Sequence, residues 1–339
     1  MTPVELSRTV LHAVRRAVDD GELSVTVPER AVVTVPGPGG CGDYATTIAL
    51  QLARSAGQPS RRVAEILVPR LTDADGIRDV VVTGPGFLNI SLAERAQADL
   101  VTAVVREVGA RGAAYGHGDA LAGQIVALRV PYEVRAEVVA DAVVRLVAAQ
   151  GGRATVEHGE PVSLRPVPAP EDPAPLGADA AQWALLHPAP HDRPRITADH
   201  LVQRESNPLF RVRYAHARVR SLSRNAGRLG FSAEPGPLGL DSDTDTGFDS
   251  GTAPHELLAA LAEHPRILAA AATHRAPDRL ARHLVTVADA ALPFLASVLP
   301  CGEEKPSAAH RARLALAEAA GTVLAGGLSL LGIDAPEHL

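Results

Sequence analysis

The chain has 339 residues, of which 46% are hydrophobic, and this is enough to form more than one buried core. It contains no run of about 18 uncharged apolar residues, and its N-terminus lacks the pattern of a secretory signal, so no membrane partner is expected. Only Cys41 and Cys301 are present, which favours reduced thiols and a cytoplasmic location over a disulfide framework.

The formal net charge of -6 disfavours nucleic-acid binding when taken alone, but phosphate contact depends on where the positive charges cluster. Nearly all positive charge is arginine, since Lys305 is the only lysine. The frequent Ala, Val, Arg, Gly and Pro are typical of a GC-rich bacterial genome.

Residues 1–118 are predicted to form a compact α+β unit. A capping box over residues 2–5 begins a helix, and Leu6, Val10, Val14 and Val18 share one face of it. Further helices are expected at 45–55, from 60 to about 71 and up to about 108. Strands are expected at 31–35, 80–82 and 87–91.

The middle of the chain, residues 119–198, is short of regular elements. A strand at 125–130, a helix at 133–149 and a strand at 154–157 are expected, and then a proline-rich stretch at 161–175. We interpret that stretch as a linker or an irregular crossing.

Residues 199–339 are predicted to form an all-α bundle, starting with a helix at 199–228. The pattern is apolar at Val212, Ala215, Val219 and Leu222. Two later heptad series continue it: Leu280, Leu284, Val287, Ala291, Phe294, Val298, and Leu314, Ala317, Gly321, Leu324, Leu328, Leu331. Pro254, Pro265, Pro277 and Pro306 each stand where a helix could begin.

Motifs for catalysis, metals and cofactors are weak. Residues 37–42 spell GxGxxG, but a helix begins at Ser60 where a dinucleotide site needs a second strand, so a glycine-rich turn is preferred. An acidic stretch at 241–249 resembles a calcium loop but has its glycine one place late, which favours a solvated loop. No cofactor, metal site or catalytic residue is therefore expected.

Several strings resemble the arginyl-tRNA synthetase family. Residues 42–50 read GDYATTIAL and residues 84–90 read GPGFLNI, which together are similar to the additional N-terminal domain of that family. Residues 207–218 read NPLFRVRYAHAR, and residues 330–339 read LLGIDAPEHL. These resemble the opening and the close of the family's DALR-type anticodon-binding domain. The implied fold is an α/β tRNA-recognition domain, a truncated Rossmann remnant and a helical bundle.

The middle of the chain departs from this family. Aligning the helix with the family's places Val130-Pro131-Tyr132-Glu133 where a His-Ile-Gly-His motif belongs, and Glu133 would oppose a nucleotide phosphate. The family's lysine-rich loop belongs before 179–183, but the interval 163–176 contains no lysine. The interval between Gly118 and Asp199 has room for about two strands, not for a six-stranded nucleotide-binding sheet. We therefore expect no aminoacylation activity.

The resemblance assigns tRNA contacts to particular residues. Phe87 would stack on a D-loop base and Asn89 would bond its edge, although Phe87 could equally be a core residue. Tyr44 and Tyr214 lie within the resembling strings. Arg204, Arg211 and Arg218 recur every seven residues, and His216, Arg220 and Arg224 flank the same helix. These are a candidate phosphate footprint, with a solvated basic helix as the alternative.

Three functions remain open from the sequence, and the third is an enzyme with unrecognised chemistry in the middle of the chain. The first is non-catalytic binding of tRNA, with an arginine isoacceptor as the implied partner and no DNA. The second is a protein-interaction module whose former RNA surfaces dock a synthetase or another protein.

Overall fold

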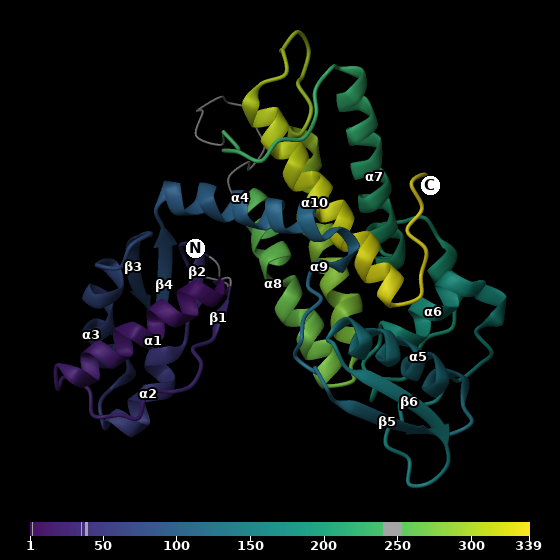
Figure 1. Ribbon diagram of the computed structural model, residues 1–339, viewed down its shortest axis with the longest axis horizontal. Coiled ribbons are helices and arrows are strands. Elements are labelled where there is room, and N and C mark those ends of the chain that lie inside the picture. Colours follow the sequence, from purple (N-terminus) through teal and green to yellow (C-terminus); the bar gives the residue numbers. More distant parts are fainter. Residues whose placement is uncertain (2, 35, 38–39, 240–252) are drawn as a thin grey trace. The chain divides into compact units, whose positions relative to one another are not determined.

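The structure, a computed structural model, describes residues 1, 3–34, 36–37, 40–239 and 253–339. The chain forms two compact units, Met1–Ala103 and Val104–Leu339 (Figure 1). The division falls within a helix, about 15 residues before the end expected for the N-terminal unit. The middle segment belongs to the same compact unit as the helical bundle.

The first unit is a four-stranded antiparallel sheet with helices packed on it. Its strands have the order β1-β2-β4-β3, with bounds Val33–Thr34, Tyr44–Thr46, Phe87–Leu92 and Ile77–Thr83 respectively. Helix α3 (Ser60–Thr72) packs on β3, and α1 (Pro3–Asp19) and α2 (Ile48–Ala56) pack on α3. Leu6, Val10 and Val14 are fully buried, which confirms the predicted apolar face of α1.

One boundary in this unit was predicted wrongly. Residues 44–46 form a strand, whereas a helix was expected from Ala45. These residues pair with both β1 and β4, so sheet hydrogen bonds override the local helical pattern. The GxGxxG stretch joins two antiparallel strands, which excludes the strand–loop–helix arrangement of a dinucleotide site.

The second unit begins with a single parallel βαβ arrangement. Helix α4 (Glu94–Arg111) and a 3-10 turn η1 (Gly112–Ala114) lead to β5 (Ile125–Val130), α5 (Val134–Ala149) and β6 (Arg153–His158). Strands β5 and β6 pair in parallel, in register from Ile125↔Arg153 to Val130↔His158. All three elements were predicted to within one residue.

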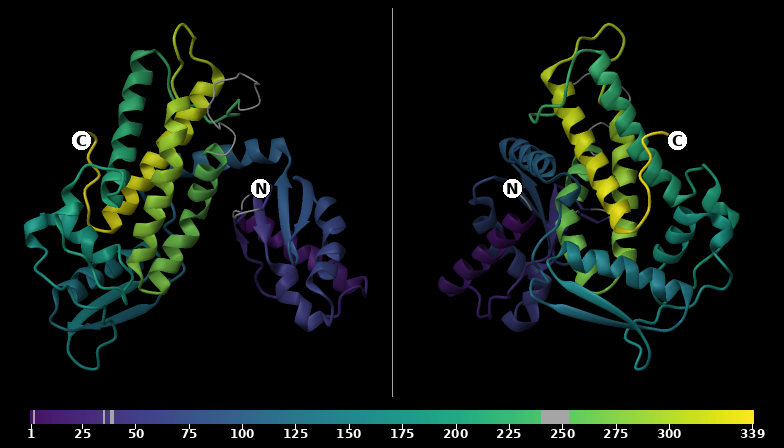
Figure 2. Two further views of the ribbon diagram at one scale, coloured as in Figure 1. Left: turned by 180° about the vertical axis from the view of Figure 1, so that it is seen from behind. Right: turned by 45° about the vertical axis from the view of Figure 1, so that its right-hand side comes forward.

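Within the described residues, five α-helices complete the second unit. They are α6 (Ala178–Leu186), α7 (Pro208–Arg228), α8 (Ala253–Thr273), α9 (Pro277–Phe294) and α10 (Ala308–Leu330). Helix α10 packs on α7, α8 and α9, and both views in Figure 2 show it running beside them. Each predicted heptad position in α9 and α10 is buried.

Two helix starts differ from the prediction. The first bundle helix begins at Pro208, not at Asp199, because the Asn207 side chain accepts from the backbone N–H groups of Leu209 and Phe210. Residues Ala198–Leu201 form only a 3-10 turn, η3. Pro265 lies inside α8, whereas it was expected to begin a helix.

Helix α10 is, within the described residues, the one helix long and apolar enough to cross a membrane, over Ala308–Leu331. In the structure, 72% of the apolar 18-residue window within this range is buried against the rest of the protein. Such burial is what the central helix of a folded bundle requires. The acidic stretch at 241–249 lies outside the described residues.

Candidate nucleic-acid interface

Phe87 lies at the start of β4, directly after the Gly84-Pro85-Gly86 turn. Its side chain is 37% exposed, so the alternative that Phe87 is a core residue is wrong. Gly84 and Gly86 both have positive φ, and an added side chain at Gly86 would collide with the backbone of Ser60. The turn therefore needs these glycines and presents an aromatic ring to solvent.

Asn89, two residues further along β4, is only 2% exposed. Its amide nitrogen donates to the Thr83 hydroxyl (2.7 Å) and to the Val81 carbonyl (3.3 Å). Its amide oxygen accepts from the backbone N–H of Cys41 (3.4 Å). The side chain therefore ties the glycine-rich loop to β3, and in this structure it does not present a free edge to a base.

Tyr44 belongs to the core of the first unit. It is 4% exposed and packs among the buried residues of this unit. The prediction that its ring contacts RNA is not supported by this position, because β2 turns the side chain into the core.

On the second unit, residues 334–338 lie along one side of α7. The Arg213 Nε donates to the Asp334 carbonyl (3.0 Å), and the His216 Nδ1 donates to the Pro336 carbonyl (3.0 Å). His216 is 5% exposed, and this burial lowers its pKa. His216 therefore anchors this C-terminal segment, in contrast to its predicted position on an RNA-facing surface.

Arg220 and Arg224 share one carboxylate of this segment. Glu337 lies 2.9 Å from Arg220 and 3.7 Å from Arg224, and all three side chains are partly exposed. Both arginines were predicted as phosphate contacts, and they do lie on one face of α7. Their charges are already compensated in part by Glu337.

Tyr214 and Arg218 lie one turn apart on α7 and remain accessible. Tyr214 is 38% exposed and stacks on Phe210 with ring centroids 5.5 Å apart. Arg218 is exposed, and among the described residues no ion pair is formed by it. The two side chains, with Ser221 and Arg224, line a hollow of about 200 Å³ beside residues 337–339.

The remaining two predicted arginines are placed apart from this face. Arg211 forms an ion pair with Asp289 of α9 (3.2 Å) and is half-buried, so it holds α7 to the bundle. Arg204 is exposed but lies in the loop before α7, because the helix begins later than predicted. The spacing of seven residues from Arg204 to Arg211 therefore does not form a helical stripe.

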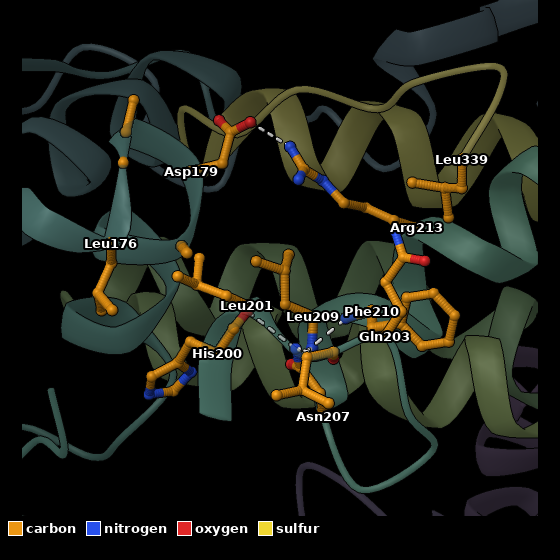
Figure 3. Close-up of a pocket in the computed structure, with 14 residues that line it drawn as sticks. Leu176, Asp179, His200, Leu201, Gln203, Asn207, Leu209, Phe210, Arg213 and Leu339 are labelled. Atoms are coloured by element: carbon orange, nitrogen blue, oxygen red, sulfur yellow. Dashed lines mark hydrogen bonds and ion pairs between the residues drawn. The ribbon is translucent and has the colours of Figure 1, made fainter. Parts of the chain in front are cut away.

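A larger pocket of about 290 Å³ lies between α6, η3 and the first turns of α7 (Figure 3). Asp179 and Arg213 form an ion pair across it, and the Asn207 amide donates to the His200 and Val202 carbonyls. These polar groups already have partners within the protein. The Asp179–Arg213 ion pair therefore links α6 to α7 across this pocket.

The N-terminus of α5 is occupied by the protein's own carboxylate. Glu133 is the N-cap, and its two oxygens accept from the backbone N–H groups of Arg135 (3.1 Å) and Ala136 (2.9 Å). The backbone N–H of Ala169, from the proline-rich stretch, also donates to Glu133 (3.1 Å). The helix end that could bind a phosphate is thus neutralised and covered.

Arg135, which was not predicted from the sequence, ties the end of α6 and the residues after it to Val167 of the proline-rich stretch. It is fully buried, and its Nε, Nη1 and Nη2 atoms donate at 2.7–3.0 Å to the carbonyls of Leu185, Val167, Asp192, Pro188 and Ala189. Nothing in the sequence distinguishes this arginine from Arg145, which also lies on α5. One guanidinium group therefore holds the residues on both sides of α6 together, and the proline-rich stretch joins this contact through Val167.

Two family models match the chain. The arginyl tRNA synthetase N terminal domain matches residues 5–92, and the DALR anticodon binding domain matches residues 212–339. The first contains Phe87 and Asn89, and the second contains Tyr214, Arg218 and the segment that packs on them.

Curated relatives are arginine–tRNA ligases. The protein from Frankia alni is 46% identical over 117 residues, which cover 34% of this chain and 20% of that relative. The protein from Pseudarthrobacter chlorophenolicus is 40% identical over 168 residues, covering 48% of this chain and 30% of that relative. The chain therefore matches less than a third of the length of each of these relatives.

Solved arginyl-tRNA synthetases share the fold. The structure from Thermus thermophilus has a TM-score of 0.67 at 14% identity, with 100% of both chains covered. The structure from Plasmodium falciparum has a TM-score of 0.67 at 8% identity, with 99% of both chains covered. The chain carries two domains of the arginyl-tRNA synthetase family, its N-terminal domain and its DALR anticodon binding domain.

Proposed function

We propose that this protein binds tRNA through its two synthetase-type domains and does not activate an amino acid. The observation that carries the proposal is the hollow on α7 lined by Tyr214, Arg218 and Arg224 within an anticodon-binding domain, with Arg220 one helical turn from Arg224. A ring that can stack and several guanidinium groups that can meet phosphates are the two requirements for binding single-stranded RNA.

The exposed ring of Phe87 provides a second contact on the other domain. Stacking on a splayed base uses the face of an aromatic ring and tolerates any base. An arginine tRNA is the proposed partner because the curated relatives are arginine–tRNA ligases. The cytoplasm is the proposed location, since translation takes place there.

The lack of amino-acid activation is proposed from α5 and its surroundings. Adenylate formation requires donor groups aimed at the charge that develops on phosphate. Here the Glu133 carboxylate accepts hydrogen bonds from the backbone N–H groups of Arg135 and Ala136 at the N-terminus of α5. The N–H of residue 169 donates to the same carboxylate. The chain's one lysine, Lys305, lies far along the sequence from this region.

RNA binding is tested by pull-down of the purified protein and sequencing of the bound RNA, followed by affinity measurements over a salt series. Enrichment of arginine tRNA is expected. Removing one arginine that meets a phosphate should reduce the salt slope by about 0.7 to 0.9, so Arg218→Gln should lower both affinity and slope. Arg165→Gln is the control, because Arg165 is an exposed arginine of the middle segment that pairs with Glu160.

A different outcome would favour the protein-docking function. Glu337 already compensates two arginines of α7, which reduces the charge available for phosphates. If RNA binding hardly changes with salt and Arg218→Gln has no effect, the α7 face is not a phosphate footprint. The docking of a protein partner would then be the better proposal.

The enzymatic part is tested separately by ATP–pyrophosphate exchange with each amino acid. No exchange above a buffer blank is expected. Restoring histidine in Val130→His/Glu133→His should not produce it, because the sheet that would hold ATP has only β5 and β6 in the described residues. Arginine-dependent exchange by the unaltered protein would overturn this part and leave RNA binding intact.

A further inference from the structure

Strand β6 is the open edge of the two-stranded sheet in the second unit. The sheet has the order β5-β6, and β5 lies beside β6 below α5 in Figure 1. Parallel sheets are normally buried on both faces and flanked by further strands. A parallel pair of strands with one uncovered edge is therefore an unusual feature that calls for a partner.

The free backbone groups of β6 can be assigned. The Arg153 N–H donates to the Gln124 carbonyl (3.0 Å), so residues 153, 155 and 157 direct their backbone groups toward β5. Ala154, Val156 and His158 consequently direct theirs outward. Within the described ranges, no backbone group from outside the sheet forms a hydrogen bond with the backbone of Ala154 or Val156.

The opposite edge of the sheet is closed in part. The Ser163 and Leu164 N–H groups donate to the Arg129 carbonyl (2.9 and 3.2 Å), and the Arg129 N–H donates to the Ser163 hydroxyl (2.9 Å). Among the residues that the structure describes, the chain thus covers the edge at β5 in part and leaves the edge at β6 available.

The side chains of β6 form a self-complementary pattern. Arg153, Thr155 and Glu157 lie on the face away from α5, and all three are exposed. When the strand is turned antiparallel to itself about Thr155, each Arg153 faces a Glu157 and Thr155 faces its own copy. The same alignment brings the outward groups of Ala154 opposite those of Val156, as an antiparallel hydrogen-bonded pair requires.

We propose that a second copy of this chain pairs with β6 in this antiparallel register, so that two βαβ units form one continuous four-stranded sheet. The interface is isologous, with the two-fold axis at Thr155. Glu157 already lies 3.8 Å from Arg129 across the sheet. In the dimer it lies between that arginine and Arg153 of the second copy, in a row of alternating charge.

Moving one β6 strand by two residues relative to the other removes this complementarity. Val156 would then face its own copy, Thr155 would face Glu157, and Arg153 would face Gly159. The exposed charge pairs contribute little affinity by themselves, so their role is to select the register while the backbone hydrogen bonds hold the strands together. A second copy fits this edge because its own β6 supplies both charges in the required order.

The first test measures mass in solution against concentration, on full-length protein freed of RNA. The unaltered protein should reach twice the protomer mass. Arg153→Glu places two glutamates opposite each other at both ends of the interface, and its dimer dissociation constant should rise about tenfold. The variant Glu157→Arg/Arg129→Glu keeps an ion pair between positions 129 and 157 within the chain. Its dimer dissociation constant should rise to a similar extent, because arginine at 157 then faces Arg153 of the second copy.

Mixing these two variants gives the decisive measurement. Glutamate at 153 in one protein then faces arginine at 157 in the other, so a heterodimer should form at concentrations at which each variant alone is mostly monomeric. Circular dichroism of each variant establishes that it is folded. A monomer at all concentrations, or a dimer of unchanged strength in Arg153→Glu, would overturn the proposal.

The second test places the two-fold axis. In a Cys41→Ser/Cys301→Ser background, Thr155→Cys should form an intermolecular disulfide on mild oxidation, because residues in a non-hydrogen-bonded pair have Cα atoms about 4.5 Å apart. Ala127→Cys is the control, since Ala127 pairs with Thr155 from the neighbouring strand and would lie about 14 Å from its copy. No cross-linking at 155, or equal cross-linking at both positions, would contradict the register.

Discussion

The carboxylate of Glu337 lies 2.9 Å from the guanidinium of Arg220, although the two residues are 117 positions apart in the sequence. The same carboxylate reaches Arg224 at 3.7 Å. An acidic side chain thus competes with phosphate for two of the arginines on the proposed RNA-binding face of α7.

Removing this competitor should strengthen RNA binding. Exposed ion pairs are worth up to about 1 kcal/mol, so Glu337→Gln should raise tRNA affinity by a factor of up to about five and steepen its salt dependence. Glu234→Gln is a matched control, because Glu234 forms a similarly exposed pair with Arg311 at 3.0 Å. Equal affinity in the two variants would show that Arg220 and Arg224 do not contact the RNA.

Phe87→Ala should weaken tRNA binding by about 1–3 kcal/mol, the value of one stacked base. Since the ring is 37% exposed, the melting temperature should change little. Phe87→Tyr retains a face for stacking and should bind nearly as well. Val81→Ala, a similarly exposed apolar position on β3, is the control. A stable Phe87→Ala protein with full affinity would exclude stacking at this turn.

Asn89→Ala should act first on stability. The change removes the hydrogen bonds to the Thr83 hydroxyl and the Cys41 N–H, which are partly buried, and this should cost about 1 kcal/mol. Urea unfolding of the first unit measures this effect. If Asn89→Ala unfolds at the same urea concentration as the unaltered protein and binds RNA less selectively, Asn89 reads a base after a rearrangement of the turn.

Arg135→Met should destabilise the second unit by about 3–5 kcal/mol. The substitution preserves most of the apolar volume but removes the guanidinium donors from five buried or partly buried carbonyls. Arg165→Met, at an exposed arginine of the same segment, should have little effect. Denaturant unfolding followed by Trp183 fluorescence reports on this region, because Trp183 is fully buried in α6.

The second unit should lose stability in acid through two stacked histidines. Burial lowers the pKa of His264 to about 3 and that of His283 to about 4, with His117 and Arg266 nearby adding to the effect. Each histidine takes up a proton in the unfolded chain near pH 6.5 but stays neutral when folded.

The free energy of unfolding should therefore fall as the pH drops from about 6.5 to about 4, by up to about 1.4 kcal/mol per pH unit for each histidine. His283→Phe should flatten this dependence, whereas His274→Gln, at an exposed position, should not. An identical slope in both variants would mean that other groups cause the acid sensitivity.

Elements with strong local periodicity could be predicted from the sequence. The heptads ending at Val298 and Leu331 are buried as expected, since each apolar stripe must face a neighbouring helix. The strands at 125–130 and 153–158 were found because β-branched residues cluster between turns. The start at Pro208 was missed because the N-cap Asn207 was read as part of a longer helix.

Individual site residues were harder to predict, because their roles depend on contacts across long sequence separations. From the sequence motifs alone, Tyr44, Asn89 and His216 were predicted to contact RNA. In the structure each is buried by a segment that the motif itself does not include. Phe87 and Arg218 retained exposed positions. Local spacing places a residue on a face, but only the packing of the whole unit determines what covers that face.

The hydrogen bonds of Arg135 have a consequence for how this protein can change over time. The guanidinium group contacts the segment formed by Val167 and residues 185–192 through main-chain oxygens, which every amino acid supplies. Side chains in that segment can therefore be replaced while its path is preserved, provided that the new residues tolerate the same backbone angles. We expect divergence among close relatives to concentrate there, with an invariant arginine on the adjoining helix.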